Sequence, residues 1–198
     1  MMKNAHIFAT HLKARRKGIT LIELLMAMSI STMLLAALYA VYSTSYQVYK
    51  SSINKAELNQ NARIALERIG RDLRQTSAIK TVLPPSDTDL LNPPSSKIQF
   101  IDGHNPDQIR YIYYYLEGNN LHRQIIHYFF TSNDDDWVPW NASEGLGILQ
   151  ESIDEDVIKA DQVTSLKFFG NNPTTVQITT ANSQGNYTYQ TEVWGRNM

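Results

Sequence analysis

The sequence predicts an α+β protein in which one long N-terminal helix precedes a head of antiparallel strands. Three observations support this prediction: an uncharged apolar run from Leu24 to Tyr49, an amphipathic pattern that continues to Gln75, and short strand-like segments separated by turn residues after residue 97. With 198 residues, the chain has room for one modest domain and an accessory segment.

The charges are divided unevenly along the chain. Residues 1–18 hold five cations and no acid. Because the whole chain has a net charge of −1, residues 19–198 carry a net charge of −6. The five cations are Lys3, Lys13, Arg15, Arg16 and Lys17. An acidic remainder argues against a nucleic-acid-binding body, which normally presents a basic face. The absence of cysteine excludes disulfide scaffolds, cysteine-bound metals and thiol nucleophiles, and it leaves the compartment open.

The apolar run is long enough to cross a bilayer, because about 20 helical residues span the hydrocarbon core. We expect residues 19–42 to form the transmembrane part. The upstream cations hold residues 1–18 in the cytoplasm by the positive-inside bias and send the head to the other side. Four tyrosines follow at the outer end, where they form an interfacial belt or pack against neighbouring helices: Tyr39, Tyr42, Tyr46 and Tyr49.

Three interpretations compete for this segment: a cleavable secretory signal, a plain anchor and a more specific signal. The apolar core is longer than a secretory signal needs, and the small residues near Ala36, Ala37 and Ala40 give no good cleavage site. A plain anchor does not explain Glu23, since an ionised acid in a membrane helix costs on the order of 3 kcal/mol and usually has a functional partner. The alternative is that Glu23 lies in the headgroup region.

The stretch Lys17-Gly18-Ile19-Thr20-Leu21-Ile22-Glu23-Leu24-Leu25 resembles the prepilin processing motif of type IV pilins and type II secretion pseudopilins. The resemblance implies cleavage between Gly18 and Ile19 by prepilin peptidase, followed by N-methylation of Ile19. The first mature residue in the family is most often Phe, and here it is Ile19. The resemblance also implies that Glu23 neutralises the N-terminal amine of a neighbouring subunit during assembly.

Elementary chemistry agrees with each part of this motif. Gly18 has no side chain to obstruct the entry of an extended backbone into a protease cleft. Cleavage creates an α-amino group, with an ordinary pKa of about 7.7–8.0, close to the carboxylate of Glu23. Their attraction is strongly distance-dependent in a low dielectric, which suits a device that sets the register between subunits.

The helix continues beyond the membrane, so we expect one helix over residues 19–75, about 85 Å long, with an amphipathic spine over 43–75. Apolar residues recur there at spacings of three and four: Leu58, Ala62, Ala65, Leu66, Ile69 and Leu73. Charged residues fill the other faces: Lys55, Glu57, Arg63, Glu67, Arg68, Arg71, Asp72 and Arg74. The segment Gln60–Gln75 is similar to a helix of PilW-type minor pilins and of the J-type minor pseudopilin.

A linker over residues 76–96 is expected to separate the helix from the head, because its four prolines and small polar residues disfavour helix and sheet. The head over residues 97–198 shows six strand-like segments: Lys97–Ile101, Gln108–Leu116, Leu121–Phe130, Val163–Phe169, Thr175–Thr180 and Tyr187–Trp194. The residues Glu117-Gly118-Asn119-Asn120 predict a hairpin turn between the second and third segments. The head pattern also resembles PilW/J-type subunits, and the whole chain resembles a pilin-like α+β fold.

The acidic residues of the head are gathered in two stretches, which we interpret as solvated loops. If the loops converged, four carboxylates would be weak candidates for a calcium site: Asp134, Asp136, Asp154 and Asp156. His122 and His127 show no metal-binding spacing, and motifs for nucleophilic or phosphate-binding sites are absent from the sequence. We therefore predict no catalytic residue, no cofactor and no enzymatic activity.

The resemblance implies a minor pilin or minor pseudopilin, a structural subunit that initiates or caps a type IV-pilus-like filament. Its expected partners are other minor and major pilins or pseudopilins, prepilin peptidase and the inner-membrane assembly platform, with no nucleic acid. Its expected place is the bacterial inner membrane as a single-pass protein with a periplasmic head, and then the filament or its tip. The J-like subunit of type II secretion stays open as an alternative. A second alternative is a signal-anchored periplasmic binding or enzymatic domain unrelated to pili.

Overall fold

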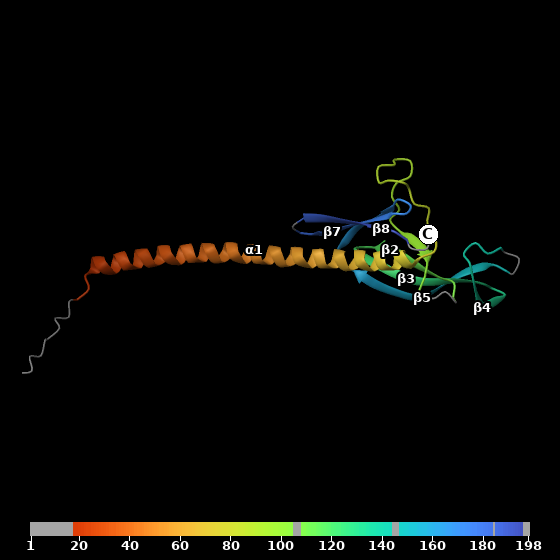
Figure 1. Ribbon diagram of the computed structural model, residues 1–198. Helices are drawn as coiled ribbons and strands as arrows, with labels where there is room; N and C mark the ends of the chain where they lie inside the picture. The colour runs from red at the N-terminus through yellow and green to blue at the C-terminus, as the bar shows by residue number, and fades with distance from the viewer. Residues whose placement is uncertain (1–17, 105–107, 144–146, 184, 196–198) are drawn as a thin grey trace, which may run out of the picture. The chain divides into compact units, whose positions relative to one another are not determined.

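The computed structural model describes residues 18–104, 108–143, 147–183 and 185–195, and it contains one long helix and eight strands within them (Figure 1). The elements follow in the order α1 (Leu21–Gln75), β1 (Ile98–Ile101), β2 (Arg110–Glu117), β3 (Asn120–Phe130), β4 (Asn133–Val138), β5 (Leu149–Ala160), β6 (Val163–Phe169), β7 (Thr174–Asn182) and β8 (Gly185–Val193). A long N-terminal helix packed on antiparallel sheets is a pilin-like α+β fold, and the predicted fold class is confirmed.

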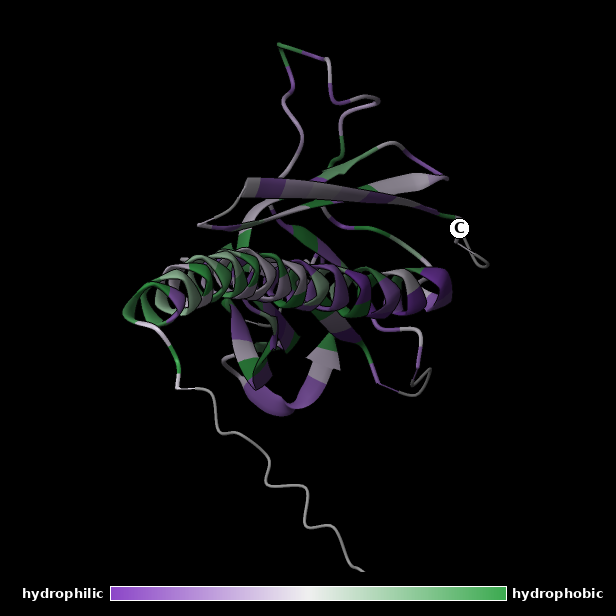
Figure 2. Cartoon of the chain, turned by 90° about the vertical axis from the view of Figure 1, so that its left-hand side faces the viewer, coloured by the Kyte–Doolittle hydropathy of each residue, from purple (hydrophilic) through white to green (hydrophobic). Residues whose placement is uncertain are grey.

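The chain divides into two units, residues 1–49 and residues 50–198, and α1 contributes to both. In the first unit the apolar side chains of α1 are exposed, with Leu21 at 78% and Met33 at 76%. This stretch is the one described helix that is long and apolar enough to cross a membrane. The hydropathy colouring shows the apolar character of α1 at its N-terminal turns (Figure 2). Since the described chain offers nothing to cover these side chains, their burial requires lipid or another subunit.

In the second unit, α1 supplies one stripe of core residues. Five of them have no exposed surface: Leu58, Ala62, Ala65, Ile69 and Leu73. Their spacings of three and four place them along one face of the helix, as the sequence pattern predicts. Ala65, Ile69 and Leu73 pack in one hydrophobic cluster with residues of both sheets, which include Phe100, Tyr114 and Val176. In Figures 1 and 2 the three-stranded sheet lies above this part of α1 and the five-stranded sheet below it.

The five-stranded sheet has the order β1-β2-β3-β4, and β5 also pairs with β3. The predicted hairpin joins β2 to β3, with Glu117 opposite Asn120 and two residues between them. Gly118, the first of these two, has a φ of 58°, which a glycine adopts without the steric cost that a Cβ brings. The three-stranded sheet is a simple meander with the order β6-β7-β8.

The two acidic stretches of the head are strands, and the prediction that they are loops is wrong. Asp134–Asp136 lie in β4, and Glu151–Asp156 lie in β5, which pairs with β3 along most of its length. Both are outer strands whose acidic side chains are largely exposed, so backbone pairing gives them their conformation despite a low strand propensity. Charged side chains on an outer strand also discourage unwanted pairing.

Residues 76–96 form neither a helix nor a regular strand, yet they pack on the head rather than stand apart from it as a spacer. Ile79 forms an isolated bridge with Phe100, and Ser95 forms another with Phe168. Leu83 packs against the hydrophobic cluster of the head. Each end of this segment is therefore fixed to a different sheet.

Candidate functional site

Residues 18–23 lead into the exposed apolar part of α1. Gly18 is exposed, and a Cβ built on it has no other atom within 4 Å. Nothing in the described fold therefore requires a glycine at this position. A glycine here is instead consistent with a requirement outside the fold, such as recognition by a protease.

The N-terminus of α1 is closed by a capping box between Thr20 and Glu23. The backbone N–H of Thr20 donates to Oε2 of Glu23 at 2.9 Å, and the hydroxyl of Thr20 donates to the same oxygen at 3.0 Å. In return, the backbone N–H of Glu23 donates to the Thr20 hydroxyl oxygen at 3.3 Å. These bonds satisfy N–H groups that the first turn of a helix leaves without an intrahelical partner.

The helix predicted from the sequence begins at Ile19, and Thr20 is not among the predicted site residues. The structure starts α1 at Leu21, with Thr20 as the residue that caps it. The signal was present in the sequence, because Thr-x-x-Glu before an apolar run is the pattern of a capping box. Glu23 is thus an exposed carboxylate held in place by Thr20, whose backbone N–H and hydroxyl both donate to Oε2. Such a carboxylate can accept a cation from another molecule.

The site is surrounded by bare apolar surface. Ile22 is 67% exposed, and Leu24 and Leu25 are each more than half exposed. The five leader cations lie outside the described residues. The described part of the site therefore consists of an exposed glycine, a capped carboxylate and an uncovered hydrophobic helix.

The four calcium candidates do not form a site. Asp134 and Asp136 lie on β4, while Asp154 and Asp156 lie on β5. No group of three or more histidine or acidic side chains that could hold a metal occurs among the residues that the structure describes. The convergence on which the calcium prediction depended fails because β4 and β5 lie on opposite edges of β3, where Tyr128 pairs with Val138 of β4 and with Glu151 of β5.

The acids of β5 instead pair with polar residues of β3. Oδ1 of Asp154 lies 2.8 Å from Nδ1 of His127, and Oδ1 of Asp156 lies 3.0 Å from Nδ1 of His122. Asp156 also accepts a hydrogen bond of 2.8 Å from Gln124, and this bond, followed by the one from His122, lowers the pKa of its carboxyl group. These contacts fasten the outer strand β5 to β3.

Comparison with known proteins adds one finding. Residues 13–39 match the family described as the prokaryotic N-terminal methylation motif. This range contains Gly18, Ile19, the capping box and the first turns of the apolar helix. No curated protein and no solved structure matches the chain.

The fold and this motif define a type IV pilin-like protein. Proteins of this class are typically structural rather than catalytic. The prepilin-type motif implies processing by prepilin peptidase and pilus-like assembly, and the apolar helix with this motif indicates anchoring in the inner membrane with a periplasmic head.

Proposed function

We propose that the chain is a minor pilin or minor pseudopilin, a non-catalytic subunit that initiates or caps a type IV-pilus-like filament. The observation that carries the proposal is the arrangement at the start of α1. There, Gly18 lies in open space and Glu23 is fixed by Thr20. Next to them begins an apolar helix surface that the described chain leaves bare.

In this proposal, residues 1–18 are a cytoplasmic leader that is removed by cleavage between Gly18 and Ile19, and Ile19 becomes N-methylated. Residues 19–42 then leave the bilayer for the filament core, where lipid contacts are exchanged for contacts with other subunits. Residues 43–75 support the head, and residues 76–96 connect the two. Glu23 pairs with the new α-amino group of a neighbour, which offsets the cost of placing both charges in a low dielectric.

The minor role is supported by the resemblance of Gln60–Gln75 and of the head pattern to PilW-type and J-type subunits, and by the absence of cysteine pairs that close many major pilin heads. The same resemblance covers a type II secretion pseudopilin of the J type. Both assignments share one mechanism: the acidic head selects partner subunits while the helix joins the common core.

The test is the N-terminal sequence and intact mass of the protein isolated from membranes of a host that has its own prepilin peptidase. We expect a chain that begins at N-methylated Ile19. The Gly18→Leu variant is expected to keep the leader, whereas Gly118→Ala, a glycine change in the head, is a matched control that is expected to be processed. The Glu23→Gln variant should be processed but should not enter filaments.

A parent chain that keeps residues 1–18, or one that is cut near Ala40, would contradict the proposal. That result would support a signal-anchored or secreted domain unrelated to pili. If Gly18→Leu were processed like the parent chain, the assigned cleavage site would be wrong.

A further inference from the structure

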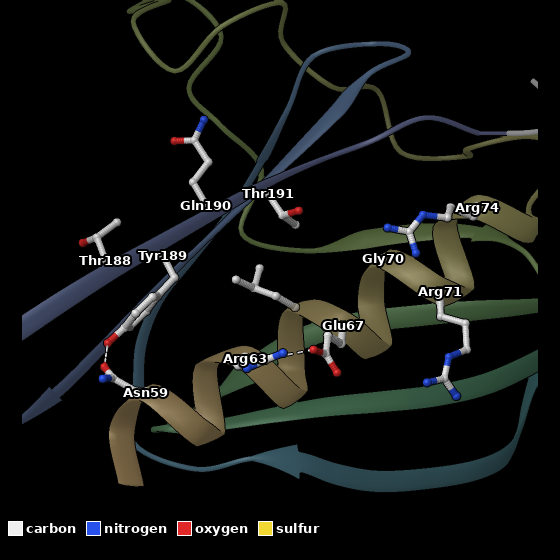
Figure 3. A pocket seen from close by; sticks show the side chains of 11 residues that line it. Asn59, Arg63, Glu67, Gly70, Arg71, Arg74, Thr188, Tyr189, Gln190 and Thr191 are labelled. Atoms are coloured by element: carbon white, nitrogen blue, oxygen red, sulfur yellow. Dashed lines mark hydrogen bonds and ion pairs between the residues drawn. The ribbon is translucent and has the colours of Figure 1, made fainter. Parts of the chain in front are cut away.

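A groove of about 830 Å³ lies between α1 and β8, within the second unit (Figure 3). One wall is a stripe along α1 that consists of Asn59, Arg63, Leu66, Glu67, Gly70, Arg71 and Arg74. The other wall consists of Thr188, Tyr189, Gln190 and Thr191 of β8. At 1.5 Å per residue the helical wall is about 22 Å long, which equals the length of six or seven residues of a β-strand.

The groove is bordered by the outer edge of β8 together with the face that carries Tyr189. Successive side chains of a strand point to opposite faces, yet four consecutive residues, Thr188–Thr191, line the groove. Figure 3 shows Tyr189 directed toward Asn59 of α1, to which its hydroxyl is hydrogen-bonded, whereas Gln190 points away from the helix. In the described chain β8 pairs only with β7, so the backbone groups along its other edge are open for pairing.

The helical wall carries positive charge that the chain does not neutralise. Arg63 is bound to Glu67, with 2.9 Å between Nε and Oε1. By contrast, the side chains of Arg71 and Arg74 form no hydrogen bond or ion pair with any other described residue, and both are exposed. The head around this groove is acidic, with 15 acidic and 7 basic residues over positions 76–198. The groove is therefore a cationic site on an otherwise acidic head, and it is suited to an anionic occupant.

The floor of the groove is small and apolar. Leu66 is partly buried, and Gly70 is buried beside Val193. A Cβ on Gly70 would lie 3.6 Å from Cγ2 of Val193 and 3.9 Å from a terminal nitrogen of Arg74, so a longer side chain at this position would project into the groove. An extended backbone can therefore approach the helix closely at this point.

We propose that this groove accepts an extended, acidic segment of a neighbouring pilin-like subunit, which adds as a strand along the open edge of β8. The inference rests on the proposed function and specifies how the head selects a partner. Backbone hydrogen bonds to β8 provide affinity that depends little on sequence. Two carboxylates two positions apart on the added strand, about 6.6 Å from each other, pair with Arg71 and Arg74 and provide specificity. A nucleic acid would use the arginines but not the strand edge.

The first test uses the full chain in detergent and a fluorescent eight-residue peptide, Thr-Val-Glu-Val-Glu-Val-Thr-Gly, with blocked ends. We expect saturable binding measured by anisotropy. The double variant Arg71→Gln/Arg74→Gln should weaken binding at least tenfold, and Gly70→Leu, which fills the groove, should do the same. The matched control Arg63→Gln/Glu67→Gln removes both members of an ion pair and leaves the net charge of the groove unchanged, so it should change binding less than twofold. Equal binding by the double variant would overturn the proposal.

Two further probes separate the contributions of charge and strand edge. The peptide with Lys in place of Glu should lose binding, and so should a peptide N-methylated at alternate positions on one edge, which cannot donate to β8. If the N-methylated peptide bound like its parent, strand addition would be refuted. Binding of a single-stranded oligonucleotide, but not of the peptide, through Arg71 and Arg74 would also refute it.

The second test places a photo-cross-linking amino acid at Gln190 in cells that assemble filaments. The expected product joins Gln190 to an acidic segment of a subunit with its own prepilin motif, and the product should decrease in the Arg71→Gln/Arg74→Gln variant. If the chain is processed at Ile19 but forms no such product, the groove proposal fails and the proposed function stands. If the peptide binds but the chain keeps its leader, the proposed function fails instead.

Discussion

The carboxylate of Asp72 on α1 accepts a hydrogen bond of 2.8 Å from Nε of Arg123 on β3, and both side chains are buried in the head. The hydroxyl of Tyr114 on β2 donates to the same carboxylate oxygen at 2.8 Å. Burial alone would lower the pKa of Arg123, but the hydrogen bond to Asp72 and the charge of this carboxylate raise it above its ordinary value. Burial also raises the pKa of Tyr114. The helix is thus joined to the sheet by a charged cluster in the interior.

Removal of Asp72 should destabilise the head strongly. The Asp72→Asn variant leaves the buried Arg123 with only the partly exposed Glu155, 3.9 Å away, as a counterion, and breaking a buried pair in this way costs on the order of 3–5 kcal/mol. The measurement is urea unfolding of the detergent-solubilised full chain, followed by fluorescence of the tryptophans, all three of which lie in the head. The control Glu67→Gln breaks the exposed pair with Arg63 and should cost less than about 0.5 kcal/mol. Equal losses in the two variants would contradict a special role for the buried pair.

Truncation of a side chain should lower the free energy of unfolding more on the face of α1 that packs on the sheets than on its exposed face. Ile69 has no exposed surface, so Ile69→Ala should lower the free energy of unfolding by about 2–5 kcal/mol through lost burial and a residual cavity. Ile64 is 49% exposed on the same helix, and Ile64→Ala should cost well under about 1 kcal/mol. The same urea titration compares the two variants, and the assigned helix orientation would be wrong if their order were reversed.

The capping box should protect the first turn of α1. In Thr20→Val the hydroxyl is lost and the shape is kept, so the cap should weaken by about 0.5–2 kcal/mol. We expect faster amide hydrogen exchange at Ile22 and Glu23 in detergent micelles, with exchange at Ile69 unchanged. Thr20→Ser keeps the hydroxyl and should restore most of the protection. If Ser and Val exchanged alike, the hydroxyl would not be the capping group.

The contact between β5 and β3 should contribute to stability in a pH-dependent way. Because hydrogen bonds from Gln124 and His122 lower the pKa of Asp156 in the folded state, its stabilising contribution is present above the ordinary Asp pKa of about 3.9 and is lost as the pH falls through the lowered value. Asp156→Asn should therefore be less stable than the parent near pH 7, by well under about 1 kcal/mol for so exposed a group. The difference in urea midpoint should vanish near pH 2, and a difference that persisted there would contradict this assignment.

The sequence predicts the long helix and its core stripe because both depend on a repeating local pattern. The spacing of Leu58, Ala62, Ala65, Ile69 and Leu73 places them on one face of any helix, whatever packs against it. The hairpin at Gly118 is equally local, since two residues between strand-like segments and a positive φ at a glycine define it. The prepilin-type motif is also local, and its match over residues 13–39 shows it directly.

The strands β4 and β5 depend on tertiary structure. Their acid-rich sequences lack strand propensity, and they become strands because β3 offers them backbone partners. The burial of Asp72 also depends on tertiary structure. Its spacing on α1 is that of a solvated charge, but Arg123 and Tyr114, far away in sequence, surround it in the folded head. No local pattern reveals such a partner.

The sequence by itself determined that residues 13–39 carry a prepilin-type motif and that an apolar helix follows Gly18, because a motif and a hydrophobic run are properties of consecutive residues. Tertiary structure alone decided that Asp72 is buried, that two acidic stretches are strands, and that Arg71 and Arg74 line the same groove as residues of β8. Each of these depends on which distant segment lies alongside, since burial and strand pairing are set by the three-dimensional path of the whole head.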